Sequence, residues 1–67
     1  FAISLARDVW VDIFEISGVH IEALHSGFLH SGSHEMSWYA EFISSGVYII
    51  SLKAGSEIRT QKVMLLK

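Results

Sequence analysis

Residues 9–16 read VWVDIFEI, and the fold class is inferred from this stretch. Val9, Val11 and Ile13 share one parity, while the other parity mixes aromatic and acidic residues. A period of two that is rich in β-branched and aromatic residues is typical of a β-strand, and a helical spacing of apolar residues fits this stretch less well. The stretch therefore predicts a strand with one apolar face.

The same period recurs along most of the chain. It predicts six strands, at residues 1–5, 9–16, 19–24, 34–39, 47–52 and 56–66, with residues 25–33 as the one longer loop. Glycines punctuate these runs, and residues 17–18 and 54–56 are expected to form hairpin turns. Short strands with regular turn signals and no helix-length segment favour an all-β antiparallel sandwich. Its expected core is Val11, Ile13, Ile21, Met36, Trp38, Ile50 and Leu52.

Composition limits how many domains the chain can form and which classes of partner it can bind. Sixty-seven residues allow a single small domain, residues 1–67, and with no Cys its stability depends on apolar packing. A net charge of −2 argues against nucleic acid as the main partner, and no apolar run is long enough to predict a transmembrane segment. The chain begins at Phe1 with neither a start Met nor a secretory signal, so we expect a fragment of a longer protein.

Charge is unevenly distributed along the chain. Residues 1–41 carry six acids and one base, whereas residues 42–67 carry one acid and four bases. The simplest expectation is that the two halves neutralise each other across neighbouring strands. The alternative is a dedicated docking surface on the basic last third.

Four short motifs, in order and in register, resemble one family. They are Ile-Phe-Glu-Ile-Ser-Gly at 13–18, Gly-Ser-His-Glu-Met-Ser-Trp at 32–38, Ser-Gly-Val-Tyr at 45–48 and Lys-Val-Met-Leu-Leu-Lys at 62–67. Together they resemble the C-terminal sorting domain of proteins exported by the type IX (Por) secretion system. Other immunoglobulin-like modules share the Trp and Ser-Gly-Val-Tyr portions, but the terminal motif resembles the sorting class in particular.

The resemblance implies a fold and a function. It implies a small immunoglobulin-like β-sandwich that lacks an upstream edge strand, so that an exposed sheet edge invites strand addition or dimerisation. It implies a non-catalytic signal, linked to an upstream cargo domain and recognised by the outer-membrane secretion machinery. The cargo would then pass from the periplasm to the cell surface or the extracellular space. No cofactor is implied.

Particular residues follow from this expectation. Docking would use an exposed edge and the basic last strand, and the candidate recognition residues are Arg59, Lys62, Val63, Leu65 and Lys67. The same pattern is also explained if Val63 and Leu65 pack in the core and the basic side chains are simply solvated. Both interpretations, docking and packing, stay open. The motif and turn positions are Gly18, Gly32, Gly46 and Tyr48.

Other kinds of site have weaker signals. His20, His25, His30 and His34 recur every four or five residues, but their positions predict no shared metal site. There is neither a nucleophile elbow nor a phosphate-binding Gly loop, so we expect no enzyme. Exposed aromatic residues such as Trp10 or Tyr39 could instead serve an accessory carbohydrate- or protein-binding module of a secreted hydrolase. A passive spacer is the third alternative.

Overall fold

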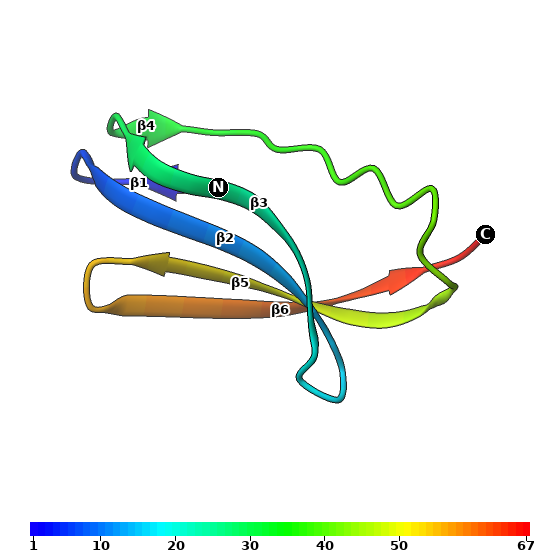
Figure 1. Cartoon of the computed structure of the whole chain (residues 1–67). Helices are drawn as coiled ribbons and strands as arrows, with labels where there is room; N and C mark the ends of the chain where they lie inside the picture. The colour runs from blue at the N-terminus through cyan, green and yellow to red at the C-terminus, as the bar shows by residue number, and fades with distance from the viewer.

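The chain forms six strands and no helix. The structure is a computed structural model that describes residues 1–67. Its strands are β1 (Ala2–Ile3), β2 (Arg7–Glu15), β3 (His20–Leu29), β4 (Gly32–Ser33), β5 (Gly46–Ala54) and β6 (Glu57–Leu65). They make two antiparallel sheets, as Figure 1 shows. The expected all-β fold, a small antiparallel sandwich of six strands, is confirmed.

The larger sheet has the strand order β3-β2-β5-β6. Its centre is the β2–β5 pair, which runs in register from Val9 opposite Ala54 to Glu15 opposite Tyr48. The four long strands cross in the middle of Figure 1 and diverge on either side, as expected of a strongly twisted sheet. The β2–β3 and β5–β6 hairpins place β3 and β6 at the two edges.

The second layer is short. β1 and β4 form only two residue pairs, and reciprocal backbone hydrogen bonds between Phe1 and His34, of 2.9 and 2.7 Å, extend this ladder by one pair. After β4 the chain runs across the top of Figure 1 to the start of β5. Within this stretch the half-buried positions alternate with exposed ones and are His34, Met36, Trp38 and Ala40.

Two predicted boundaries are wrong. Residues 34–39, expected as a strand, keep the period of two but pair with no neighbour after His34. Their alternation comes from packing against the larger sheet, because apolar periodicity reports burial rather than hydrogen bonding. Residues 25–33, expected as a loop, are mostly strand, because the first half of β2 needs a partner and finds it in the second half of β3. Gly27 pairs with Val9 there.

The core is thin. Its fully or nearly buried members are Ile3, Val9, Val11, Ile13, Tyr48 and Ala54. Val11 and Ile13 were expected there. The other five expected core residues, Ile21, Met36, Trp38, Ile50 and Leu52, are only half-buried. The short second layer leaves part of the inner face of the larger sheet uncovered, and this explains the difference.

The expected hairpin turns are confirmed. Gly18 lies in the β2–β3 turn with a φ of 99°, and its N–H donates to the carbonyl of Glu15 over 2.9 Å. The β5–β6 turn has two residues, Gly55 and Ser56, between the paired Ala54 and Glu57. Only the first has a positive φ, of 62°, as in a type II′ turn that suits the twist of a hairpin.

Candidate functional site

The four motifs of the sequence meet around one side chain, that of Tyr48. Its backbone lies between Glu15 on β2 and Val63 on β6. Its ring packs against Trp38 with centroids 5.3 Å apart, and its hydroxyl donates to the carbonyl of Ser44 over 2.6 Å. A hydroxyl that returns to the backbone a few residues upstream also fixes a loop in immunoglobulin-like sandwiches. Segments distant in sequence therefore form one end of the molecule.

The motif glycines take different positions in this arrangement. Gly18 turns the chain between β2 and β3, whereas Gly32 lies in β4 opposite Ile3. Gly46 begins β5, and a Cβ added to it would lie 3.8 Å from the ring of Tyr48. Gly46 thus lies beside the aromatic pair, and it pairs with Leu65 of the last motif.

The strand β6 is an open edge of the larger sheet. It pairs with β5 over nine consecutive residues without a bulge, and no strand lies on its other side. The opposite edge, β3, contains two register shifts against β2. Bulges twist an edge and discourage strand addition, so β6 is the edge that is better suited to accept another strand.

The hydrogen-bonding groups along this edge follow from the turn. A two-residue turn closes with a bond from the N–H of Glu57 to the carbonyl of Ala54, and antiparallel pairs then alternate between bonded and unbonded. The residues whose backbone groups point away from β5 are therefore Ile58, Thr60, Lys62 and Met64. These groups are the free acceptors and donors of the edge.

The five predicted recognition residues share this strand and its end, but not one face. Arg59, Val63 and Leu65 lie opposite Leu52, Tyr48 and Gly46, on the inner face of the sheet. Lys62 lies opposite Ile49, on the outer face. Lys67 follows the strand and is fixed to the preceding loop, because its Nζ donates to the carbonyl of Glu41 over 2.6 Å and its backbone N–H to Oγ of Ser45 over 3.0 Å.

Burial divides the same five residues. Val63 and Leu65 are half-buried, so they contribute to packing under Tyr48 as well as to the surface. Arg59 is exposed and forms an ion pair with Glu57, with Nη2 and Oε1 2.7 Å apart. Both side chains are largely in solvent, so the pair is worth less than about 1 kcal/mol. Lys62 is exposed and has no ion-pair partner.

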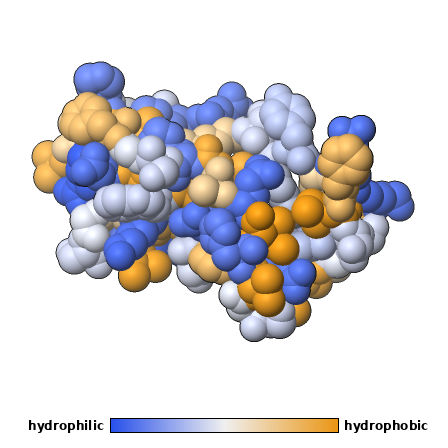
Figure 2. Space-filling model, in the orientation of Figure 1, coloured by the Kyte–Doolittle hydropathy of each residue, from blue (hydrophilic) through white to orange (hydrophobic).

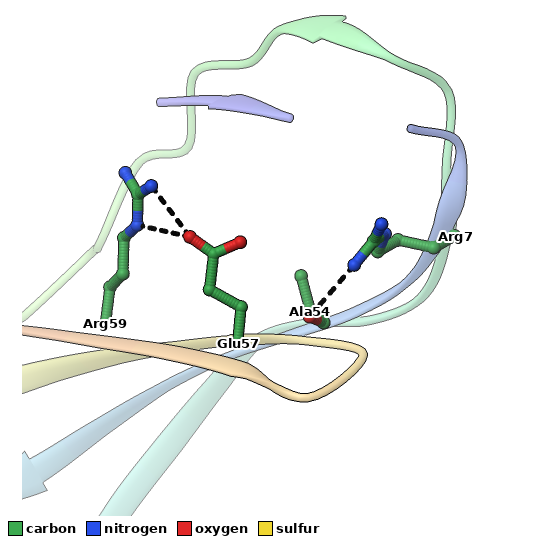
Figure 3. A network of polar contacts seen from close by, with 4 residues as sticks. All are labelled: Arg7, Ala54, Glu57 and Arg59. Atoms are coloured by element: carbon green, nitrogen blue, oxygen red, sulfur yellow. Dashed lines mark hydrogen bonds and ion pairs between the residues drawn. The ribbon is translucent and has the colours of Figure 1, made fainter. Parts of the chain in front are cut away.

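Figure 3 shows the polar contacts at the β5–β6 turn. Glu57 and Arg59 turn toward each other above β6, and Arg7 reaches from the start of β2 to the carbonyl of Ala54, with Nη1 and the oxygen 3.2 Å apart. The Arg7 contact ties β2 to the turn, because it joins residues 47 positions apart. Both arginines are therefore engaged in contacts within the chain.

A groove that sequence reasoning missed lies on the inner face. It has a volume of about 500 Å³ and runs between the extended segment near Met36 and the strands β5 and β6. Ile50 and Leu52 form part of its floor, and Arg59 and Gln61 line its open side. The available signal was the polar inner parity of β6, at residues 57, 59 and 61, where a closed sandwich would carry apolar side chains.

The histidines do not converge. Nε2 of His34 donates to the carbonyl of His30 over 2.7 Å, and Nε2 of His25 donates to the carbonyl of Gly27 over 3.1 Å. His20 lies on the outer face, with Nε2 2.9 Å from Oδ1 of Asp12. No three His, Asp or Glu side chains lie close enough together to hold a metal ion.

Exposed apolar residues gather at several places. Figure 2 shows apolar residues in patches among polar ones, with one patch in the lower part of the view, where Figure 1 places the β2–β3 turn. Ile16 and Val19, on either side of this turn, are more than half exposed. Phe42 and Tyr39, in the long loop before β5, are exposed by 93% and 84%, so neither aromatic ring is needed for the core.

No helix in the structure has the length and apolar character needed to cross a membrane. No protein-family model matches the chain, and neither a curated protein nor a solved structure matches it.

Proposed function

We propose that this chain is a sorting domain of the type IX class, a non-catalytic signal that delivers a covalently linked upstream cargo to the cell surface. The observation that carries the proposal is the meeting of the four motifs around Tyr48 beside the open edge of β6. Motifs that only stabilise a shared fold can lie anywhere in that fold. Here the motif at 45–48 pairs with β6 and the motif at 62–67 lies on it, while the motifs at 13–18 and 32–38 are joined to this edge through Tyr48.

The proposed mode of recognition is strand addition. The outer-membrane machinery would pair a strand of its own with the free backbone groups of β6, while side chains next to this edge provide specificity. Lys62 and Arg59 lie on opposite faces of the edge, so a paired strand would have a basic group on each side. Lys67, held against the loop before β5, marks the end of the surface.

A proline on the edge tests this mode directly. Thr60→Pro removes one outward N–H and no bond to β5, and proline is tolerated on an edge strand with its nitrogen toward solvent. Residues 1–67 are fused to a periplasmic reporter in a host with the type IX system, and surface delivery is measured by protease accessibility on intact cells. We expect the wild-type fusion to reach the surface and Thr60→Pro to remain in the periplasm.

The controls separate docking from folding. Circular dichroism of the purified variant must show an unchanged strand spectrum, and Thr60→Val must be delivered like the wild type. The triple change of Arg59, Lys62 and Lys67 to Ala is expected to reduce delivery, whereas Lys53→Ala, on the neighbouring strand, leaves delivery unchanged. A wild-type fusion that stays in the periplasm would contradict the proposed function, and efficient delivery of Thr60→Pro would contradict strand addition.

One observation favours a second function, an accessory carbohydrate-binding module. Trp10 is 39% exposed on the outer face of the larger sheet, between Ser26 and Lys53 in the register. An indole flanked by polar side chains offers a stacking platform for a sugar ring. A glycan array decides between the two functions: binding that is lost in Trp10→Ala and kept in Tyr39→Ala would favour the carbohydrate-binding module.

A further inference from the structure

The outer face of the larger sheet is open. It is the face opposite to β1, β4 and the segment 34–40, and the register assigns to it the even-numbered residues of β2 and β6 and the odd-numbered residues of β5. Along its middle lie Trp10, Phe14 and Ile49, and at its β6 side lies Ile58, which is 62% exposed. This face combines a central apolar strip with charged neighbours.

The charges on this face are separated by strand. The acids Asp8 and Asp12 lie on β2, and the bases Lys53 and Lys62 lie on β5 and β6. The expectation that the two halves of the chain neutralise each other across strands is wrong, because no Lys or Arg of β5 or β6 forms an ion pair with an acid of β2 or β3. In the register, Lys53 lies opposite Trp10 and Lys62 lies opposite Ile49.

We propose that a second copy of this chain packs on the outer face, related by a two-fold axis parallel to the strands. Such an axis places β2 of one copy over β5 of the other. Lys53 then lies over the partner's Trp10, between the partner's Asp8 and the partner's Asp12, which are about 7 Å from Trp10 along the strand. Phe14 lies over the partner's Ile49, and each contact occurs twice.

The positions of the charged groups and of the Trp10 indole both favour this arrangement. An ammonium group over an indole face with a carboxylate on either side has two kinds of electrostatic partner. An axis running across the strands would instead stack β2 on β2 and β5 on β5, so that Lys53 would not lie over the acids of β2. A face with its acids on one side and its bases on the other is self-complementary only in the first arrangement.

The area fits a weak dimer. Four strands at about 4.8 Å spacing and nine residues at about 3.4 Å each give a face of about 580 Å². Two copies together would bury about 1,200 Å², which is the lower end of the range for stable interfaces. Sheets that pack face to face in sandwiches use the same kind of contact. The dimer is therefore expected to depend on protein concentration and on salt.

Charge reversal with mixing tests the proposal. The full chain is studied by sedimentation equilibrium, where the wild type should approach twice its 7.5 kDa mass as its concentration rises. Lys53→Glu places Glu against the partner's acids, and Asp8→Lys places Lys against the partner's Lys53. Each variant alone should raise the dimer dissociation constant at least about tenfold. An equimolar mixture of the two should dimerise again, because three of the four opposed pairs are then of opposite charge, and the one exception is the introduced Glu beside the partner's Asp12.

Matched controls keep the test specific. Lys67→Glu and Glu41→Lys change the net charge by the same amounts away from this face and should leave the dissociation constant unchanged. The proposal is overturned by a wild-type chain that stays monomeric up to about 1 mM. It is equally overturned by a dimer that survives both charge reversals.

Discussion

The indole of Trp38 lies edge-on against the ring of Tyr48, with an interplanar angle of 73° and centroids 5.3 Å apart. Trp38 belongs to a segment with no strand partner, whereas Tyr48 is buried in β5. The contact therefore fastens the long connection to the sheet, and it does so at the end of the molecule where the four sequence motifs meet.

The hydroxyl of Tyr48 provides the first prediction. Tyr48→Phe keeps the ring and its contact with Trp38 but leaves the carbonyl of Ser44 without its 2.6 Å donor. We expect the free energy of unfolding to fall by about 1 kcal/mol, the usual net value of one hydrogen bond. Urea unfolding followed by circular dichroism measures it. Tyr39→Phe, at a ring exposed by 84%, should change nothing, and an equal loss in both variants would contradict this role for Tyr48.

The nitrogen of Trp38 provides the second prediction. Nε1 is buried and has no hydrogen-bond partner, which costs free energy that a hydrocarbon ring would not. Trp38→Phe should therefore change the free energy of unfolding by less than about 1 kcal/mol, because lost area and the relieved polar group offset each other. Trp38→Ala should cost about 2 to 3 kcal/mol, since the side chain is only half-buried. A loss in Trp38→Phe as large as in Trp38→Ala would show that Nε1 is satisfied in solution.

Two glycines of β5 and its turn provide a matched pair. Gly55 has a φ of 62°, and an added Cβ would lie 2.8 Å from Nη1 of Arg7. Gly46 has no positive φ, and an added Cβ would meet the Tyr48 ring at an ordinary 3.8 Å. Gly55→Ala should lower the free energy of unfolding by about 1 to 2 kcal/mol, and Gly46→Ala should be neutral or slightly stabilising. Thermal unfolding of both variants checks the order, and the reverse order would contradict the turn geometry.

The sequence predicted the strands correctly where alternating apolar residues are bounded by glycine turns. The stretch around Val11 and Ile13 alternates cleanly, and its parity determines which side chains are buried. At β5, residues 47–50 are apolar on both parities, so the inward direction of Tyr48 was visible only once its partners were known. When both faces of a strand are apolar, its sequence does not indicate which face is buried.

The errors have one physical source. Residues 34–39 look like a strand because every second side chain packs on the sheet. A strand also needs a neighbouring segment for its backbone hydrogen bonds, and the sequence does not indicate whether one is present. The groove between Met36 and Arg59 depends on how much of the sheet the second layer covers, which is a property of tertiary structure. The candidate recognition residues could be placed on one strand from the sequence, but their division between faces required the register.

The thin core leads to the last prediction. Ile13 is fully buried, and only five other residues are buried, so each core methylene contributes a large share of the stability. Ile13→Val should lower the free energy of unfolding by about 1 kcal/mol, and Ile13→Ala by at least about 2 kcal/mol, enough to unfold much of the protein at 25 °C. Ile16, exposed by 57%, should tolerate the same change to Val within about 0.5 kcal/mol. Because a dimer stabilises the folded state by mass action, the comparison is made at one protein concentration below dimer formation. If Ile16→Val were the more costly of the two, the inner face of β2 would have been assigned to the wrong parity.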